Sequence, residues 1–149
     1  MHRHTLWMPV MLLIAGLSLT GCKQTSEAVA DEESGPAKVE HLDGAEPSRV
    51  TLTEEAAKRI DLQTAEVRTI VINGAQRTVI PYAAILYDTE GNTWVYTSAE
   101  PLVFMRHRVV VDYIEGEQAV LSDGPVAGTA VVTVGATELN GAELEFEEE

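Results

Sequence analysis

The sequence contains one cysteine, Cys22, and few aromatic or basic residues. Its 149 residues include two phenylalanines and two tryptophans, and 10 Lys and Arg stand against 24 Asp and Glu, for a formal net charge of −14. A lone cysteine excludes an intramolecular disulfide bond. The excess of acids excludes nucleic acid as a partner, because such a surface repels a phosphate backbone.

Sequence signatures of catalysis and of metal binding are also missing. No serine stands in a Gly-x-Ser-x-Gly setting, and no phosphate-binding loop occurs. After residue 21, the sulfur and imidazole side chains that could bind a metal ion are Met105, His41, His107 and Cys22. We therefore predict no catalytic residue, no cofactor, no metal site and a protein that is not an enzyme.

The N-terminal 21 residues have the three parts of an export signal. A short basic start that includes Arg3 precedes an apolar run over residues 6–19, and a Leu-Thr-Gly sequence then leads to Cys22. The apolar run is shorter than the roughly 20 residues of a membrane-spanning helix. These features predict a signal peptide over residues 1–21.

The four residues 19–22 resemble the lipobox of bacterial lipoproteins, in which the cysteine thiol receives a diacylglyceryl group and becomes the new N-terminus. This resemblance implies lipidation of Cys22, a membrane partner bound through acyl chains, and a place in the cell envelope that faces the periplasm or the cell exterior. An ordinary signal peptide with an incidental cysteine and an uncleaved signal anchor are the alternatives.

Residues 22–48 are acidic and rich in Ala, Ser, Gly and Pro, with no apolar period. Such a segment buries too little apolar surface to offset its ordering entropy, so we expect a disordered acidic tether. Five glutamates within residues 143–149 suggest a solvated acidic tail.

Between these segments, residues 49–142 carry the pattern of a small, mainly β domain. Thr53 followed by Glu54 and Glu55 predicts the start of one short helix near residues 53–60. Asn73-Gly74 predicts a tight turn, and short apolar segments separated by turns continue to residue 134. The spacing favours a small β-barrel or sandwich, with one helical turn possible at residues 137–139.

Two blocks of this domain resemble periplasmic adaptor subunits, or membrane fusion proteins, of resistance-nodulation-division efflux pumps. The first block covers residues 49–67, including Ile60-Asp61-Leu62-Gln63-Thr64, and the second runs from Val79, through Pro81-Tyr82 and Trp94-Val95-Tyr96, to Leu139. The second block is similar to the adaptors' C-terminal, membrane-proximal domain. The short segment between the blocks contains residues 68–76, so the lipoyl domain and helical hairpin of a full adaptor are absent between them.

Arg106, His107 and Arg108 form the one basic cluster of the domain, and Arg106 and Arg108 share one face of a strand. They predict either a docking site for an acidic partner or lipid headgroup, or pairing with nearby acids in the sheet. Trp94, Tyr96 and Phe104 form either a recognition patch or part of the core.

The resemblance implies an accessory or truncated efflux adaptor that contacts a membrane transporter or other adaptor subunits. The alternative is a free-standing surface lipoprotein that binds a ligand or protein unrelated to transport.

Overall fold

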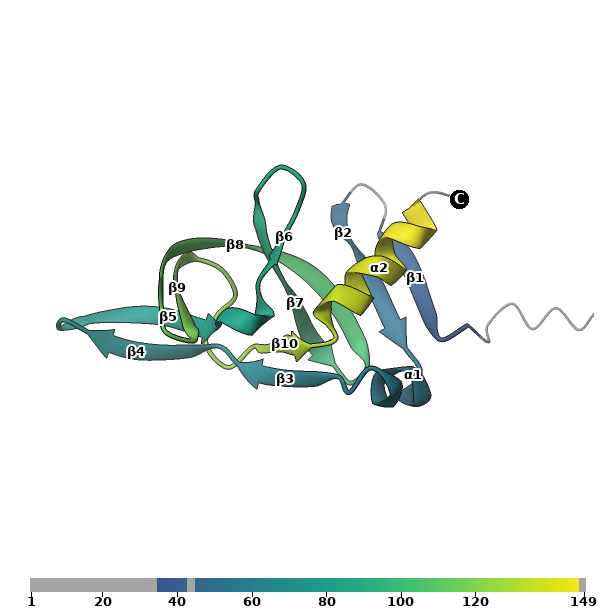
Figure 1. Cartoon of the computed structure of the whole chain (residues 1–149), viewed down its shortest axis with the longest axis horizontal. Helices are drawn as coiled ribbons and strands as arrows, with labels where there is room; N and C mark the ends of the chain where they lie inside the picture. Colours follow the sequence, from purple (N-terminus) through teal and green to yellow (C-terminus); the bar gives the residue numbers. More distant parts are fainter. Residues whose placement is uncertain (1–34, 43–44, 148–149) are drawn as a thin grey trace, which may run out of the picture. The chain divides into compact units, whose positions relative to one another are not determined.

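The computed structural model describes residues 35–42 and 45–147, and they form the mainly β module predicted from the sequence, a curled half-barrel sheet (Figure 1). The predicted signal peptide, Cys22, and residues 22–34 of the predicted tether lie outside the described residues. The elements in chain order are β1 (Ala37–Leu42), β2 (Ala45–Leu52), α1 (Glu54–Arg59), β3 (Gln63–Glu66), β4 (Arg68–Ile72), β5 (Ala75–Pro81), the 3-10 turn η1 (Tyr82–Ala84), β6 (Leu86–Tyr87), β7 (Thr93–Glu100), β8 (Val103–Glu115), β9 (Gln118–Asp123), β10 (Ala130–Val134) and α2 (Ala136–Glu147).

The main sheet has the strand order β3-β10-β7-β8-β9-β5-β4. The long strand β8 curls the sheet, because its first half pairs with β7 and β2 and its second half pairs with β9. The two end strands of this order, β3 and β4, are neighbours in the chain and are separated by Val67 alone. One continuous segment therefore supplies both ends of the sheet.

Val67 fixes this junction. Its side chain is buried, its N–H donates to the carbonyl of Thr129 at 2.9 Å, and its carbonyl accepts from the N–H of Gly128 at 2.8 Å. The hydrogen bonds that pair β10 with β3 thus extend one residue further along the chain and end where β4 begins.

Alternating side chains of the central strands build two hydrophobic cores. Val95 of β7 and Val131 of β10 belong to the first core, whereas the next residues along, Tyr96 and Val132, belong to the second. Successive residues of a strand point to opposite faces, so β7 and β10 are buried on both sides. The first core consists of Val67, Ile80, Ala84, Ile85, Val95, Val109, Ala119, Leu121 and Val131. The second core joins residues of β2, α1 and α2 to the other face of the central strands, and it consists of Val50, Leu52, Ala56, Tyr96, Phe104, Val132, Ala136 and Leu139.

Helix α1 confirms the predicted start at Thr53. The Thr53 Oγ1 atom accepts a hydrogen bond from the N–H of Ala56 at 3.1 Å, which satisfies one of the free donors of the first turn. Glu54 and Glu55 occupy that turn, where the helix dipole favours negative charge. Buried Ala56 attaches the helix to the second core.

The Asn73-Gly74 turn is also confirmed, and it joins β4 to β5. Both residues have positive φ, 52° and 81°, which is the conformation of a type I′ turn. The turn sets Ile72 opposite Ala75 and extends the antiparallel register to Arg68 opposite Val79.

The predicted disordered tether over residues 22–48 is wrong for residues 37–42 and 45–48, which belong to β1 and β2. Val39 of β1 lies opposite Val50 of β2, and it packs against the second core. A hydrogen bond of 2.9 Å joins Ser48 Oγ to His41 Nδ1 across the two strands. Ala37 and Val39 of β1 pack against the second core, and so short an apolar pattern within an acidic segment does not stand out in the sequence.

The predicted acidic tail is likewise wrong over residues 143–147, which continue α2. The expected single turn at residues 137–139 is the start of a 12-residue helix, so the domain has a second helix beyond the predicted one. Glu143 is fully buried in this helix. Ala136, Leu139 and Glu143 follow the i, i+3, i+7 spacing of one helix face, and that face packs on the second core.

Candidate functional site

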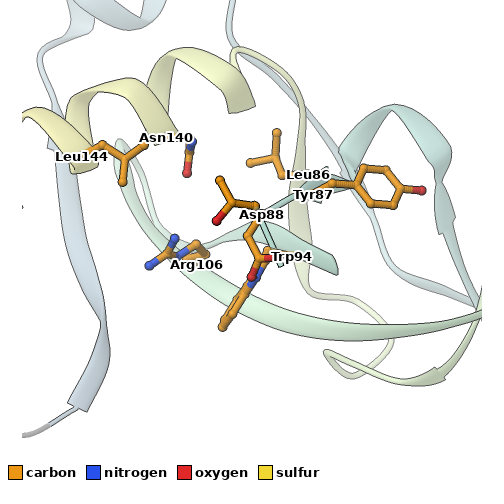
Figure 2. A pocket seen from close by; sticks show the side chains of 8 residues that line it. Leu86, Tyr87, Asp88, Trp94, Arg106, Asn140 and Leu144 are labelled. Carbon is orange, nitrogen blue, oxygen red and sulfur yellow. The ribbon is translucent and has the colours of Figure 1, made fainter. Parts of the chain in front are cut away.

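A pocket of about 270 Å³ lies between α2 and the segment from β6 to β7 (Figure 2). Figure 2 shows Asn140 and Leu144 of α2 on one side of the pocket, with Trp94 and Arg106 on the sheet opposite them. Its remaining lining residues are Leu86, Tyr87, Asp88 and Thr89.

Asp88 organises the loop between β6 and β7. One carboxylate oxygen accepts from the N–H groups of Glu90 and Asn92 at 2.9 and 2.8 Å. The other accepts from Trp94 Nε1 at 3.0 Å and from Asn92 Nδ2 at 2.8 Å. The hydrogen bond from Trp94, followed by that from Asn92, lowers the pKa of Asp88 to about 2. Asp88 is therefore a permanently charged loop anchor at neutral pH rather than a proton donor.

Arg106 contacts two residues inside the domain. Its side chain is only 15% exposed, and its Nη2 atom lies 3.4 Å from Glu143 Oε1. Its guanidinium carbon stands 5.0 Å from the centre of the Trp94 ring, within the range of a cation–π contact. Arg106 therefore pairs with an acid that comes from a helix and not from the sheet, and its predicted docking role stays a prediction.

Glu143 links α2 to two strands of the sheet at once. Its Oε2 atom accepts a 2.5 Å hydrogen bond from the hydroxyl of buried Tyr96 on β7, and its Oε1 atom faces Arg106 on β8. A fully buried carboxylate needs such partners, because desolvation of an unpaired charge costs several kcal/mol. Sequence reasoning missed this residue, yet its spacing from Ala136 and Leu139 was a usable signal.

Arg108 remains on the surface. It lies on the same face as Arg106, as predicted, because their cross-strand partners are Trp94 and Tyr96, two residues apart on β7. Its side chain is exposed and its Nη2 atom donates to Asn92 Oδ1 at 2.8 Å. The predicted docking pair is thus divided, with one arginine in an internal network and one at its rim.

The aromatic residues divide in the same way. Tyr96 and Phe104 are core residues with 0% and 2% exposure, whereas Trp94 is half-buried beside the pocket. Within residues 35–42 and 45–147, no group of three or more His, Cys, Asp or Glu side chains is arranged to hold a metal ion. None of the helices in that part of the chain combines the length and the apolar character needed to cross a bilayer.

Comparisons with known proteins return few similar chains. No protein-family model matches the sequence, and no curated protein matches it. Among solved structures, the chain is similar to an NMR structure of 180 residues of SilB from Cupriavidus metallidurans CH34, which contains the N-terminal metal-binding site and the membrane-proximal domain. The match has 22% sequence identity and a TM-score of 0.42, and it covers 72% of this chain and 67% of that chain.

Proposed function

We propose that this protein is a non-enzymatic accessory of an envelope transport system. In this proposal, lipid on Cys22 holds an adaptor-like domain at a membrane, where the domain contacts a transporter or other adaptor subunits. The sequence resemblance to efflux adaptors supplies the class of partner, and the lipobox supplies the anchor.

The observation that carries the proposal is that the two adaptor-like blocks pair with each other. β2 and β3 come from the first block, and they pair respectively with β8 and β10 from the second. The hairpin of β4 and β5 replaces the intervening adaptor domains with a two-residue turn. The two adaptor-like blocks therefore form one sheet without the intervening adaptor domains. A domain that docks on its own needs such a continuous sheet.

The polar groups in the pocket, together with Glu143 beside it, support a non-enzymatic role. Asp88 accepts hydrogen bonds that hold its own loop, and Arg106 and Glu143 neutralise each other. Groups that are fixed by one another in this way serve to position α2 and the β6–β7 loop. A catalytic base would instead need a pKa near the working pH.

The test is co-purification from the cells that make the protein. The full chain, tagged after Glu149, is crosslinked in intact cells, extracted in mild detergent and analysed by mass spectrometry. We expect enrichment of a transporter or adaptor subunit over an equally tagged, unrelated lipoprotein. Enrichment of envelope proteins without any transport component would overturn the proposal in favour of a free-standing surface lipoprotein.

A further inference from the structure

Among the described residues, no strand pairs with the outer edge of β4, which leaves backbone hydrogen-bonding groups available there. Val67 directs its N–H and C=O toward Thr129 and Gly128. Alternate residues of a strand direct these groups to the same side, so Thr69 and Val71 direct theirs to that side as well, away from β5. β4 ends the strand order, and no strand of residues 35–42 and 45–147 other than β5 pairs with it (Figure 1).

The side chains along this edge are apolar and basic. Val71 is 69% exposed, and Arg68 and Arg77 are both exposed. Because Arg77 lies opposite Ile70, which is two residues from Arg68, the two arginines share one face of the hairpin. Residues 67–87 contain no Asp or Glu at all, although the whole chain carries 24. The hairpin is thus a cationic edge on an acidic protein.

We propose that the β4 edge binds an extended, acidic segment of the partner protein by strand addition. The N–H and C=O groups of Thr69 and Val71 would pair with the backbone of the added strand, and Arg68 and Arg77 would select acidic side chains on it. Charge complementarity favours an acidic strand over a second copy of this protein, because pairing two β4 edges would bring arginines near arginines. The inference rests on the proposed function for the identity of the partner as a transport component.

The geometry gives a selective way to block the edge. A proline at position 71 removes an N–H that points outward, so pairing of β4 with β5 is kept while one donor to the added strand is lost. The double substitution Arg68→Glu and Arg77→Glu reverses the charge without touching the core, since both side chains are exposed. The matched control is Lys58→Glu with Arg59→Glu, which makes the same charge change on exposed positions of α1.

The binding test uses the full chain in detergent and two acetylated hexapeptides, one of alternating Glu and Val and the other of alternating Lys and Val. Amide NMR signals and hydrogen exchange are followed as each peptide is added. We expect the Glu-Val peptide alone to shift and protect the Thr69 and Val71 amides. The Arg68→Glu/Arg77→Glu variant and Val71→Pro should each weaken binding by about tenfold, and the α1 control by less than about twofold.

Equal binding of the two peptides, or shifts centred on α1 or on the pocket, would overturn the inference. A second readout separates it from the proposed function. If the transport component co-purifies equally with wild type, Val71→Pro and the arginine variant, the edge is not the contact while the proposed function stands. If no transport component is enriched but the Glu-Val peptide binds the edge as described, the proposed function fails and the strand-addition surface stands.

Discussion

At the residue scale, Glu143 governs how α2 is attached to the sheet. It is fully buried and contacts both Tyr96 and Arg106, so it connects β7, β8 and α2 through one carboxylate. Buried ion pairs add little net stability compared with a well-packed apolar pair, but removal of one partner leaves an uncompensated charge. The network therefore specifies where α2 docks more than it strengthens the fold.

We expect Glu143→Ala to lower the free energy of unfolding by about 3–5 kcal/mol, because Arg106 loses its ion-pair partner and Tyr96 loses one hydrogen-bond acceptor. Urea denaturation followed by Trp fluorescence measures this loss. Glu145→Ala, at an exposed position of the same helix, is the control and should cost less than about 0.5 kcal/mol. Equal effects at the two positions would contradict the role of the buried network.

A second prediction at this scale concerns the stability that Asp88 contributes. Its folded-state pKa of about 2 lies below the ordinary value of 3.8, so its contribution is complete above pH 4 and is lost as the pH falls toward 2. The Asp88→Asn variant should be less stable than wild type at pH 6, and the difference should shrink between pH 4 and pH 2. Denaturation midpoints across that range provide the measurement, and a difference that does not depend on pH would contradict it.

At the scale of elements, the connection between β10 and α2 depends on Gly135. Gly135 has φ of 91°, and a Cβ atom there would stand 3.0 Å from Ile60 Cδ1, a side chain packed on the second core. The chain thus turns from strand to helix in a conformation that side chains disfavour, close against the end of α1.

We expect Gly135→Ala to destabilise the protein more than Gly74→Ala, and equal costs at the two positions would contradict a contribution from the contact with Ile60. Gly74 has a similar φ of 81°, but a Cβ atom at that position would meet no heavy atom within 4 Å, so it reports the conformational cost alone, about 1–2 kcal/mol. Gly135→Ala adds the contact with Ile60. Thermal or urea unfolding of both variants compares the two costs.

Local sequence signals predicted the elements whose stabilising interactions are local. The Thr53 cap and the Asn73-Gly74 turn depend on residues within a few positions, and both formed as expected. β1 and the buried Glu143 depend on partners in other strands, such as Val50 for Val39 and Tyr96 for Glu143. Their acidic surroundings resemble solvated segments, and only tertiary packing distinguishes them.

The same distinction applies to the candidate site. The common face of Arg106 and Arg108 follows from strand periodicity and was predictable. Their different environments were not, because they depend on how α2 folds back over β7 and β8. The i, i+3, i+7 spacing within residues 136–143 would have placed Glu143 toward the core, but its charge argued for the surface.

At the scale of the whole molecule, the lipid on Cys22 would decide where the domain works. We expect intact-mass analysis of the membrane-extracted protein to show an N-terminal cysteine at position 22 that carries acyl chains, with residues 1–21 removed. Cys22→Ser should abolish the added mass and release the domain from the membrane fraction or leave it unprocessed. An unmodified Cys22 in the mature wild-type protein would contradict the anchor.

The Asn73-Gly74 turn has an evolutionary consequence for the whole domain. The turn joins β4 to β5, which pair with each other, and β5 also pairs with β9, so both strands that flank the turn have partners in the sheet. An inserted segment could leave the sheet at Asn73 and return at Gly74. Its cost in loop-closure free energy would be small, since each doubling of loop length costs only about 0.6 kcal/mol. The turn is therefore a position at which evolution can insert or delete a whole domain while the sheet keeps its architecture.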